Sequence, residues 1–132
     1  MIFVDTSFWV ALRNRRDDHH AEARELLRSH AATALLTSNH VKGETWTFLR
    51  RRAGHASAAQ FLDFMESTDR LQVEHVVEVI EQEALGWLRR HDEREYSFVD
   101  ATSFSLMRRM GIGEALAFDG DFAAAGFVEL WA

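Results

Sequence analysis

The stretch that decides the fold is MIFVDTSFWV, residues 1–10. Ile2–Val4 is a short apolar run of the kind that forms a buried parallel strand, and Asp5 ends it. Thr6 and Ser7 follow before the apolar residues resume, which is typical of the start of a helix. A carboxylate therefore stands at the carboxyl end of the first predicted strand, where open parallel sheets place their functional groups.

The rest of the chain alternates short apolar runs with longer segments that repeat apolar residues at helical spacing. Further strands are predicted at Ala34–Thr37, Leu71–Glu74, Ala115–Phe118 and Val128–Leu130. This alternation predicts an α/β fold, a three-layer α/β/α sandwich with a mainly parallel central sheet. The chain has 132 residues, no proline and no linker-like segment, so we expect a single domain over residues 1–132.

Composition narrows the classes of function. The absence of cysteine excludes disulfides and cysteine-ligated zinc or iron–sulfur sites. The apolar start carries no basic leader and is interrupted by Asp5, so we expect no signal peptide or membrane span, and a soluble, cytoplasmic protein. A net charge of −6 argues against a surface built wholly for nucleic acid. Local cationic patches remain possible, and they would consist of arginine, because Lys42 is the single lysine.

Four acids stand close to predicted strand ends or helix starts. Asp5 follows the first strand and Asp119 the fourth, while Glu44 and Asp100 lie in the first turns of predicted helices. Each has a local explanation as well. Asp5 can cap a helix, Asp100 can complete a capping box, and Asp119 belongs to a DGD turn with Asp121.

Helical spacing predicts that two of these acids lie on buried faces of their helices. Asp100 shares a helix face with Phe104, and Glu44 lies between Val41 and Phe48, so both carboxylates are expected on otherwise buried faces. Acidic side chains are rarely buried unless they pair with a cation or bind a metal. Arginines close in sequence keep a structural ion-pair network open as one alternative.

Convergence at one edge of the sheet is the other alternative. Two carboxylates about 4 Å apart repel each other by roughly 4 kcal/mol at an effective dielectric constant near 20. A cluster of them would raise its pKa values or recruit cations. A donor set made only of oxygen favours Mg²⁺ or Mn²⁺, and the lack of a paired-histidine motif argues against zinc.

The ordered motifs VDTS (4–7), GETW (43–46), FVDA (98–101) and AFDGDF (117–122), followed by AGF, resemble the PIN domain. The compact length resembles more narrowly the VapC-type toxins of bacterial type II toxin–antitoxin pairs, and the resemblance covers essentially the whole chain. It implies a metal-dependent endoribonuclease that binds Mg²⁺, or Mn²⁺, through a catalytic set of Asp5, Glu44, Asp100 and Asp119.

The resemblance also implies roles for the neighbours of these acids. Asp121 is a further metal ligand, and Thr6 and Ser7 match hydroxyl positions beside the first acid. Spacing alone leaves open whether Asp119 or Asp121 is the nearer ligand, and the phenylalanine-flanked family pattern favours Asp119.

RNA and protein partners follow from the same resemblance. RNA backbone contacts are predicted for Lys42, Arg50, Arg51 and Arg52, and for the tract Arg13, Arg15 and Arg16, although solvated helix faces explain these residues equally well. A VapB-type antitoxin and a homodimer are also implied. Residues suited to an antitoxin groove are Phe8, Trp9, Trp46 and Leu49, for which core packing is the simpler explanation. Trp46 could instead stack on an RNA base.

Rival functions make different demands on the sequence. A receiver or dehalogenase-like phosphotransfer domain would place a lysine late in the chain, and none follows Lys42. A nucleotide-binding module would need a glycine-rich loop between a strand and a helix, and none is present. An RNA-binding or RNA-processing PIN-like protein that is not a toxin, or that does not cleave, remains the open alternative. The presence of all four acids favours catalysis.

Overall fold

Parallel strands form the centre of the structure, a computed structural model that describes residues 1–132. The strands are β1 (Ile2–Val4), β2 (Leu35–Ser38), β3 (Leu71–Glu74), β4 (Glu114–Leu116) and β5 (Val128–Glu129). They lie side by side in the order β3-β2-β1-β4-β5, and every neighbouring pair is parallel. The inner strands β1 and β2 are buried along their whole length, as expected for strands covered on both faces.

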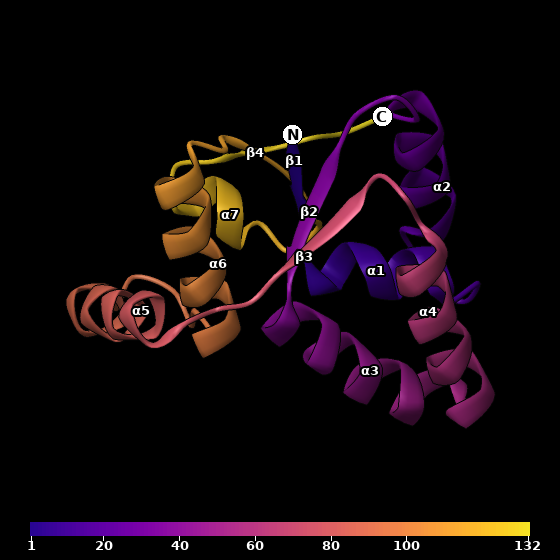
Figure 1. The fold of residues 1–132 in the computed structure, drawn as a ribbon, viewed down its shortest axis with the longest axis horizontal. Coiled ribbons are helices and arrows are strands. Elements are labelled where there is room, and N and C mark those ends of the chain that lie inside the picture. Colours follow the sequence, from indigo (N-terminus) through magenta and orange to yellow (C-terminus); the bar gives the residue numbers. More distant parts are fainter.

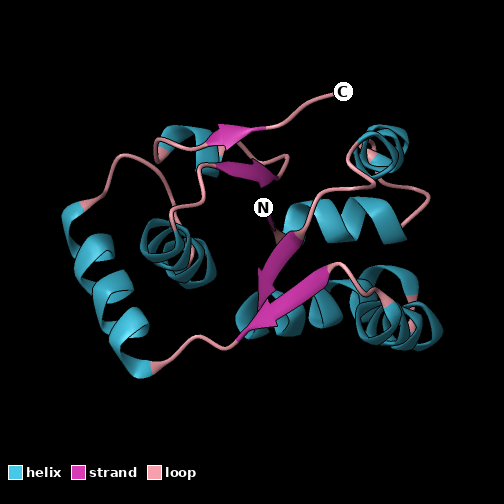
Figure 2. Cartoon of the chain, turned by 45° about the horizontal axis from the view of Figure 1, so that its top comes forward, coloured by secondary structure: helices cyan, strands magenta, loops and turns pink.

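Seven helices surround this sheet. They are α1 (Thr6–Arg13), α2 (His20–Ser29), α3 (Asn39–Ala53), α4 (His55–Ser67), α5 (Glu78–Arg90), α6 (Phe98–Met110) and α7 (Asp121–Ala124). Figure 1 shows α1, α2 and α4 on one side of the sheet and α5, α6 and α7 on the other, with α3 leaving the carboxyl end of β2. Figure 2 shows the same division in a turned view. The predicted three-layer sandwich with a parallel sheet is therefore confirmed. No helix has the length and apolar character needed to cross a bilayer.

Three predicted strands differ from the observed ones at their ends. The second begins at Leu35 and extends to Ser38, because Ser38 still pairs with β3 before its hydroxyl caps α3. The fourth begins at Glu114, which pairs with β5, and it stops at Leu116, because the N–H of Phe118 donates to a side chain instead of a neighbouring strand. The fifth ends at Glu129, one residue earlier than predicted.

Most of the large apolar residues that were candidates for an antitoxin groove belong to the core of the protein. Phe8, Trp9 and Leu49 have no exposed surface, so their assignment to an antitoxin groove is wrong. Trp9 is also tied into the core by its indole N–H, which donates to the Thr37 hydroxyl over 3.4 Å. Trp46 is half-buried and packs edge-on against His55.

Strand order places the first acid beside the last pair of acids. The chain runs from β1 outward through β2 to β3, and then returns to add β4 on the other side of β1. The carboxyl ends of β1 and β4 therefore meet at the point where the direction of winding changes, which is where open α/β sheets bind ligands. The N–H of Asp5 donates to the carbonyl of Leu116 over 3.0 Å, and it joins the two strands at this point.

Candidate active site

A cleft of about 410 Å³ opens at the carboxyl ends of β1 and β4. All five acids predicted for the site line it, namely Asp5, Glu44, Asp100, Asp119 and Asp121. They come from four different segments of the chain, with Asp119 and Asp121 in the same turn, so the fold brings the segments together. Two further acids, Asp17 and Glu95, lie in the same lining.

Asp5 is both a helix cap and a buried acid. Its carboxylate accepts hydrogen bonds from the amide and the hydroxyl of Ser7, over 3.1 and 2.7 Å, and so begins α1. Burial raises the pKa of Asp5 to about 8, the nearby charge of Asp119 adds to the rise, and the bonds from Ser7 oppose it. The Ser7 hydroxyl also accepts the N–H of Phe118 over 3.0 Å, which ties the first acid to the segment before Asp119.

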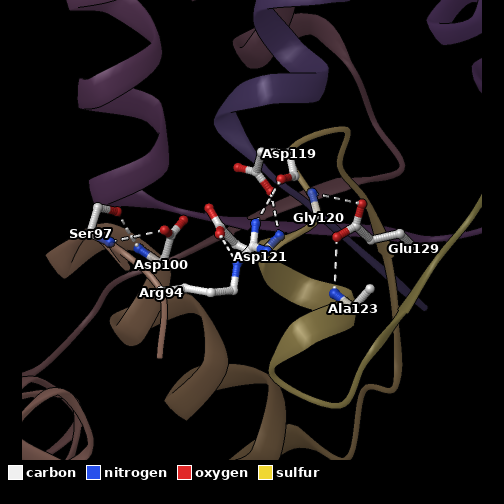
Figure 3. A network of polar contacts seen from close by, with 8 residues as sticks. All are labelled: Arg94, Ser97, Asp100, Asp119, Gly120, Asp121, Ala123 and Glu129. Carbon is white, nitrogen blue, oxygen red and sulfur yellow. Dashed lines mark hydrogen bonds and ion pairs between the residues drawn. The ribbon is translucent and has the colours of Figure 1, made fainter. Parts of the chain in front are cut away.

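Asp100 lies in the first turn of α6, where it completes a capping box with Ser97. Its amide donates to the Ser97 hydroxyl, and its carboxylate accepts the Ser97 amide, each over 3.0 Å (Figure 3). The side chain is buried on the helix face that was predicted for it. Burial raises the pKa of Asp100 to about 7 against the effect of the Ser97 amide, and the charges of Asp119 and Asp121 contribute to the rise.

Asp119 and Asp121 are held by a tight turn that begins α7. Gly120 between them has φ +82°, a left-handed conformation that favours glycine. The carboxylate of Asp119 accepts the Asp121 amide over 3.1 Å. Glu129 of β5 accepts the amides of Gly120 and Ala123 over 3.3 and 2.9 Å and supports the turn from behind (Figure 3).

Arg94 contacts the outer side of this turn. Its Nε donates to Asp121 over 2.9 Å and its Nη2 to the Asp119 carbonyl over 3.2 Å (Figure 3). Sequence reasoning missed both Arg94 and Glu129. Nothing in the sequence separates them from other charged residues of loops and edge strands, because their role depends on the path of the chain.

The ion-pair alternative is excluded for four of the five acids. No salt bridge is formed by Asp5, Glu44, Asp100 or Asp119, and Asp121 pairs with Arg94 alone. Of the arginines close in sequence to the acids, Arg109 pairs instead with Glu83 outside the cleft. The pKa of Asp119 is also raised, by partial withdrawal from water and then by the charges of Asp121 and Glu129. The cleft therefore holds a surplus of negative charge.

One group of oxygens in the cleft could hold a metal ion. Carboxylate oxygens of Asp100, Asp119 and Asp121 lie within 4.8 Å of one another, and the group contains no histidine. Asp5 is close enough for its charge to interact with Asp119 and Asp100. The donor set is all oxygen and electrostatically strained, which fits a hard divalent cation.

Glu44 and Thr6 lie in the cleft in positions that differ from the expectation. The buried face of α3 consists of Val41, Thr45 and Leu49, and Glu44 lies half-buried at the edge of this face. Glu44 also lies outside the group formed by Asp100, Asp119 and Asp121. Thr6 makes no hydrogen bond to Asp5. Its buried hydroxyl has no protein partner, whereas Ser7 contacts Asp5 directly.

The rim of the cleft carries one aromatic platform and one arginine. The rings of His19 and Phe118 stack with centroids 4.5 Å apart, and both line the cleft, a pairing that the sequence did not indicate. Among the cationic residues predicted to bind RNA through α3, Arg52 lines the cleft, whereas Lys42, Arg50 and Arg51 do not.

Comparison with known proteins agrees with this geometry. The PIN domain family matches residues 2–128. The chain is 58% identical over 130 residues to the 23S rRNA-specific endonuclease VapC20 of Mycobacterium tuberculosis, in strains CDC 1551 and H37Rv, with 98% of each chain covered. The crystal structure of M. tuberculosis VapC20, described as a sarcin-ricin loop cleaving toxin, superposes over 100% of both chains with a TM-score of 0.94 at 54% identity. The chain therefore belongs to the PIN domain family of nucleases, which use divalent metals, and within it to the VapC-type toxins.

Proposed function

We propose that this single-domain chain is a Mg²⁺-dependent endoribonuclease toxin that cuts the sarcin-ricin loop of 23S rRNA. The observation that carries the proposal is the meeting of Asp5, Asp100, Asp119 and Asp121 in one cleft without cationic partners for three of them. Identity of 58% along nearly the full length to an endonuclease named for 23S rRNA supports the choice of substrate.

The acids would have different roles in the site, according to where they lie. Asp100, Asp119 and Asp121 would hold the ion, because their oxygens already lie together. Mn²⁺ would suit the same donors. Asp5 adds a further negative charge from the end of β1. The Ser7 hydroxyl, which bonds both the Asp5 carboxylate and the Phe118 amide, keeps this carboxylate next to the segment that carries Asp119. Glu44 belongs to the same acidic set and faces the cleft from α3.

A bound divalent cation would offset the repulsion between the acids and the RNA phosphate and would lower the pKa of water at the site. The chain's own residues supply the geometry of the reaction. Thr6 offers a buried hydroxyl without a protein partner inside the cleft, suited to hold a water or a substrate oxygen. His19 and Phe118 present a stacked pair of rings at the rim, and unpaired RNA bases stack on such surfaces.

Partners follow from the toxin assignment. We propose that a VapB-type antitoxin covers the cleft, and that the chain forms a homodimer. An antitoxin that neutralises the site needs a cationic group to satisfy the surplus charge of the acids. Lys42, Arg50 and Arg51, which lie outside the cleft, would contact more distant parts of the RNA.

The test is cleavage of a synthetic sarcin-ricin loop RNA, with end mapping, in Mg²⁺ and in EDTA. We expect cleavage that requires Mg²⁺ and is lost in Asp5→Asn, whereas the exposed Asp63→Asn on α4 cuts at the wild-type rate. Wild-type cleavage in EDTA, or undiminished cleavage by Asp5→Asn, would contradict the mechanism. Cleavage of unrelated RNAs at equal rates would contradict the substrate.

A further inference from the structure

A second hollow, of about 300 Å³, lies next to the acidic cleft and has the opposite charge. Its lining consists of Arg13, Asn14, Arg15, Arg16, Arg52, Ala53 and Ser57. No acidic side chain lines it, and none of its arginines forms a salt bridge within the chain. We call these four arginines and their hollow the arginine pocket. Four arginines without carboxylate partners, concentrated in one place in a chain of net charge −6, suit an external anion.

One face of α3 joins the arginine pocket to the acids. Glu44, Phe48 and Arg52 are spaced four residues apart, so they lie along one side of the helix over about 12 Å. All three line the acidic cleft, and Arg52 lines the arginine pocket as well. The Arg52 guanidinium lies 4.9 Å from the centre of the Phe48 ring, which holds it at the junction of the two hollows.

The backbone that carries the arginine pocket is held by local hydrogen bonds. Asn14 accepts the Arg16 amide through its side chain over 3.2 Å, and its carbonyl accepts the Asp17 amide over 3.0 Å. These bonds fix the turn that carries Arg15 and Arg16. The Arg13 guanidinium lies 5.3 Å from the centre of the Phe64 ring. The same turn carries His19 into the acidic cleft, so the two hollows are fixed relative to each other.

The start of α4 adds backbone donors at the same place. No side chain caps this helix, which begins at His55 after Gly54, and Ser57 of its first turn lines the arginine pocket. The amides of a first helical turn without a cap favour an anion, as the arginines do.

We propose that the arginine pocket binds a backbone phosphate of the RNA that flanks the phosphate to be cut. The proposal rests on the proposed function, because it takes the acidic cleft as the place of cleavage. Arginine forks match phosphate oxygens in pairs, and contacts to phosphates fix the register of a nucleic acid without reading its bases. The pocket would thus determine which phosphate of the strand reaches the acids.

Binding of a fluorescently labelled single-stranded RNA, measured by anisotropy over a series of KCl concentrations, tests this pocket. EDTA in all samples keeps the RNA intact. The variant R15A/R16A removes two exposed side chains that would hold this phosphate. We expect the magnitude of the slope of log affinity against log salt to fall by about 0.7, and the affinity at 0.1 M salt to fall by about 5-fold. The melting temperature should stay at the wild-type value.

Two further variants control for charge and position. R15K/R16K keeps both charges and should keep the wild-type salt slope. R89A/R90A removes two arginines from α5, on the opposite side of the sheet, and should bind RNA as the wild type does (Figure 1). An unchanged salt slope in R15A/R16A, or an equal loss in R89A/R90A, would overturn the proposal.

Cleavage in Mg²⁺ separates this proposal from the one it rests on. If wild type cuts RNA and R15A/R16A raises KM by more than it lowers kcat, both stand. If wild type cuts RNA and R15A/R16A has unchanged binding and KM, the arginine pocket is refuted and the nuclease is not. If wild type fails to cut RNA while R15A/R16A has a smaller slope of log affinity against log salt, the arginine pocket stands as a phosphate site and the proposed cleavage is refuted.

Discussion

Removing the charge of Asp5 should stabilise the protein whenever divalent cations are absent. Asp5→Asn is the suitable change, because asparagine caps helices as well as aspartate does and can accept the same two bonds from Ser7. What the substitution removes is a buried negative charge beside Asp119 and Asp100. A residue needed for the proposed cleavage is therefore one whose charge opposes folding.

The size of the effect follows from the raised pKa of Asp5. A shift from 3.8 to about 8 is about four pKa units. At about 1.4 kcal/mol per unit, this corresponds to a destabilisation on the order of 5 kcal/mol at alkaline pH. Because neighbouring carboxyl groups can take up protons in its place, we expect the measured gain in Asp5→Asn to be smaller than this figure.

The pH dependence has a definite sign. Folded Asp5 binds its proton more tightly than unfolded Asp5, so its stabilising contribution is complete below pH 3.8 and is lost as pH rises to about 8. Wild type and Asp5→Asn should therefore be nearly equal in unfolding free energy at pH 4. They should separate progressively up to pH 8.

Urea unfolding in EDTA at pH 4, 6 and 8 measures this difference. The matched control is Asp63→Asn, an exposed acid on α4 outside the cleft, which should show no pH-dependent gain. Repeating the series in Mg²⁺ should stabilise wild type more than Asp5→Asn, because ligand binding to the folded state adds to its stability. A less stable Asp5→Asn at pH 8 in EDTA, or a difference that does not change with pH, would refute the reasoning.

Two further changes test the support of the acids. Ser7→Ala removes the bond that lowers the Asp5 pKa and leaves the Phe118 amide unpaired, so we expect a loss of about 1 to 2 kcal/mol in unfolding free energy and an acidic limb of the pH–rate profile shifted to higher pH. An unshifted profile would show that Ser7 does not tune Asp5. Gly120→Ala forces a side chain into a left-handed backbone, 3.4 Å from Arg94 Nη2, and should cost about 1 to 2 kcal/mol and reduce cleavage. Its control is Gly43→Ala in α3, where the added methyl group meets open space and should stabilise by up to about 1 kcal/mol. Equal effects of the two alanines would argue against a special turn at Gly120.

Sequence alone was sufficient for the architecture because its signals are local. The apolar run before Asp5 and the apolar spacing of the helical segments depend only on near neighbours, and parallel winding then brings Asp5 and Asp119 to one edge. The capping box at Asp100 was likewise readable from Ser97, three residues away. Asp5 and Asp100 are each a helix cap and a buried acid at once, so these two interpretations of the sequence are not alternatives.

The contacts between distant loops were beyond reach from the sequence. Arg94 and Glu129 reach the DGD turn from the α5–α6 loop and from an edge strand, and no periodic pattern marks them. Helical phase could have separated Arg52 from Arg50 and Arg51, because it stands eight residues after Glu44 on the same side of α3. Large apolar residues such as Phe8 suit a core and a groove equally, and only the packing decides between them.

The acids of the cleft are held by structural elements of very different size. Asp5 is joined to the central sheet through its own amide, and Asp100 lies in the first turn of a helix of 13 residues buried along most of one side. Asp121 starts a helix of four residues, which is held by the buried Phe122 and by the side chains of Arg94 and Glu129. The position of the last carboxylate therefore depends on contacts from two distant segments of the chain, whereas Asp5 is held by the sheet itself.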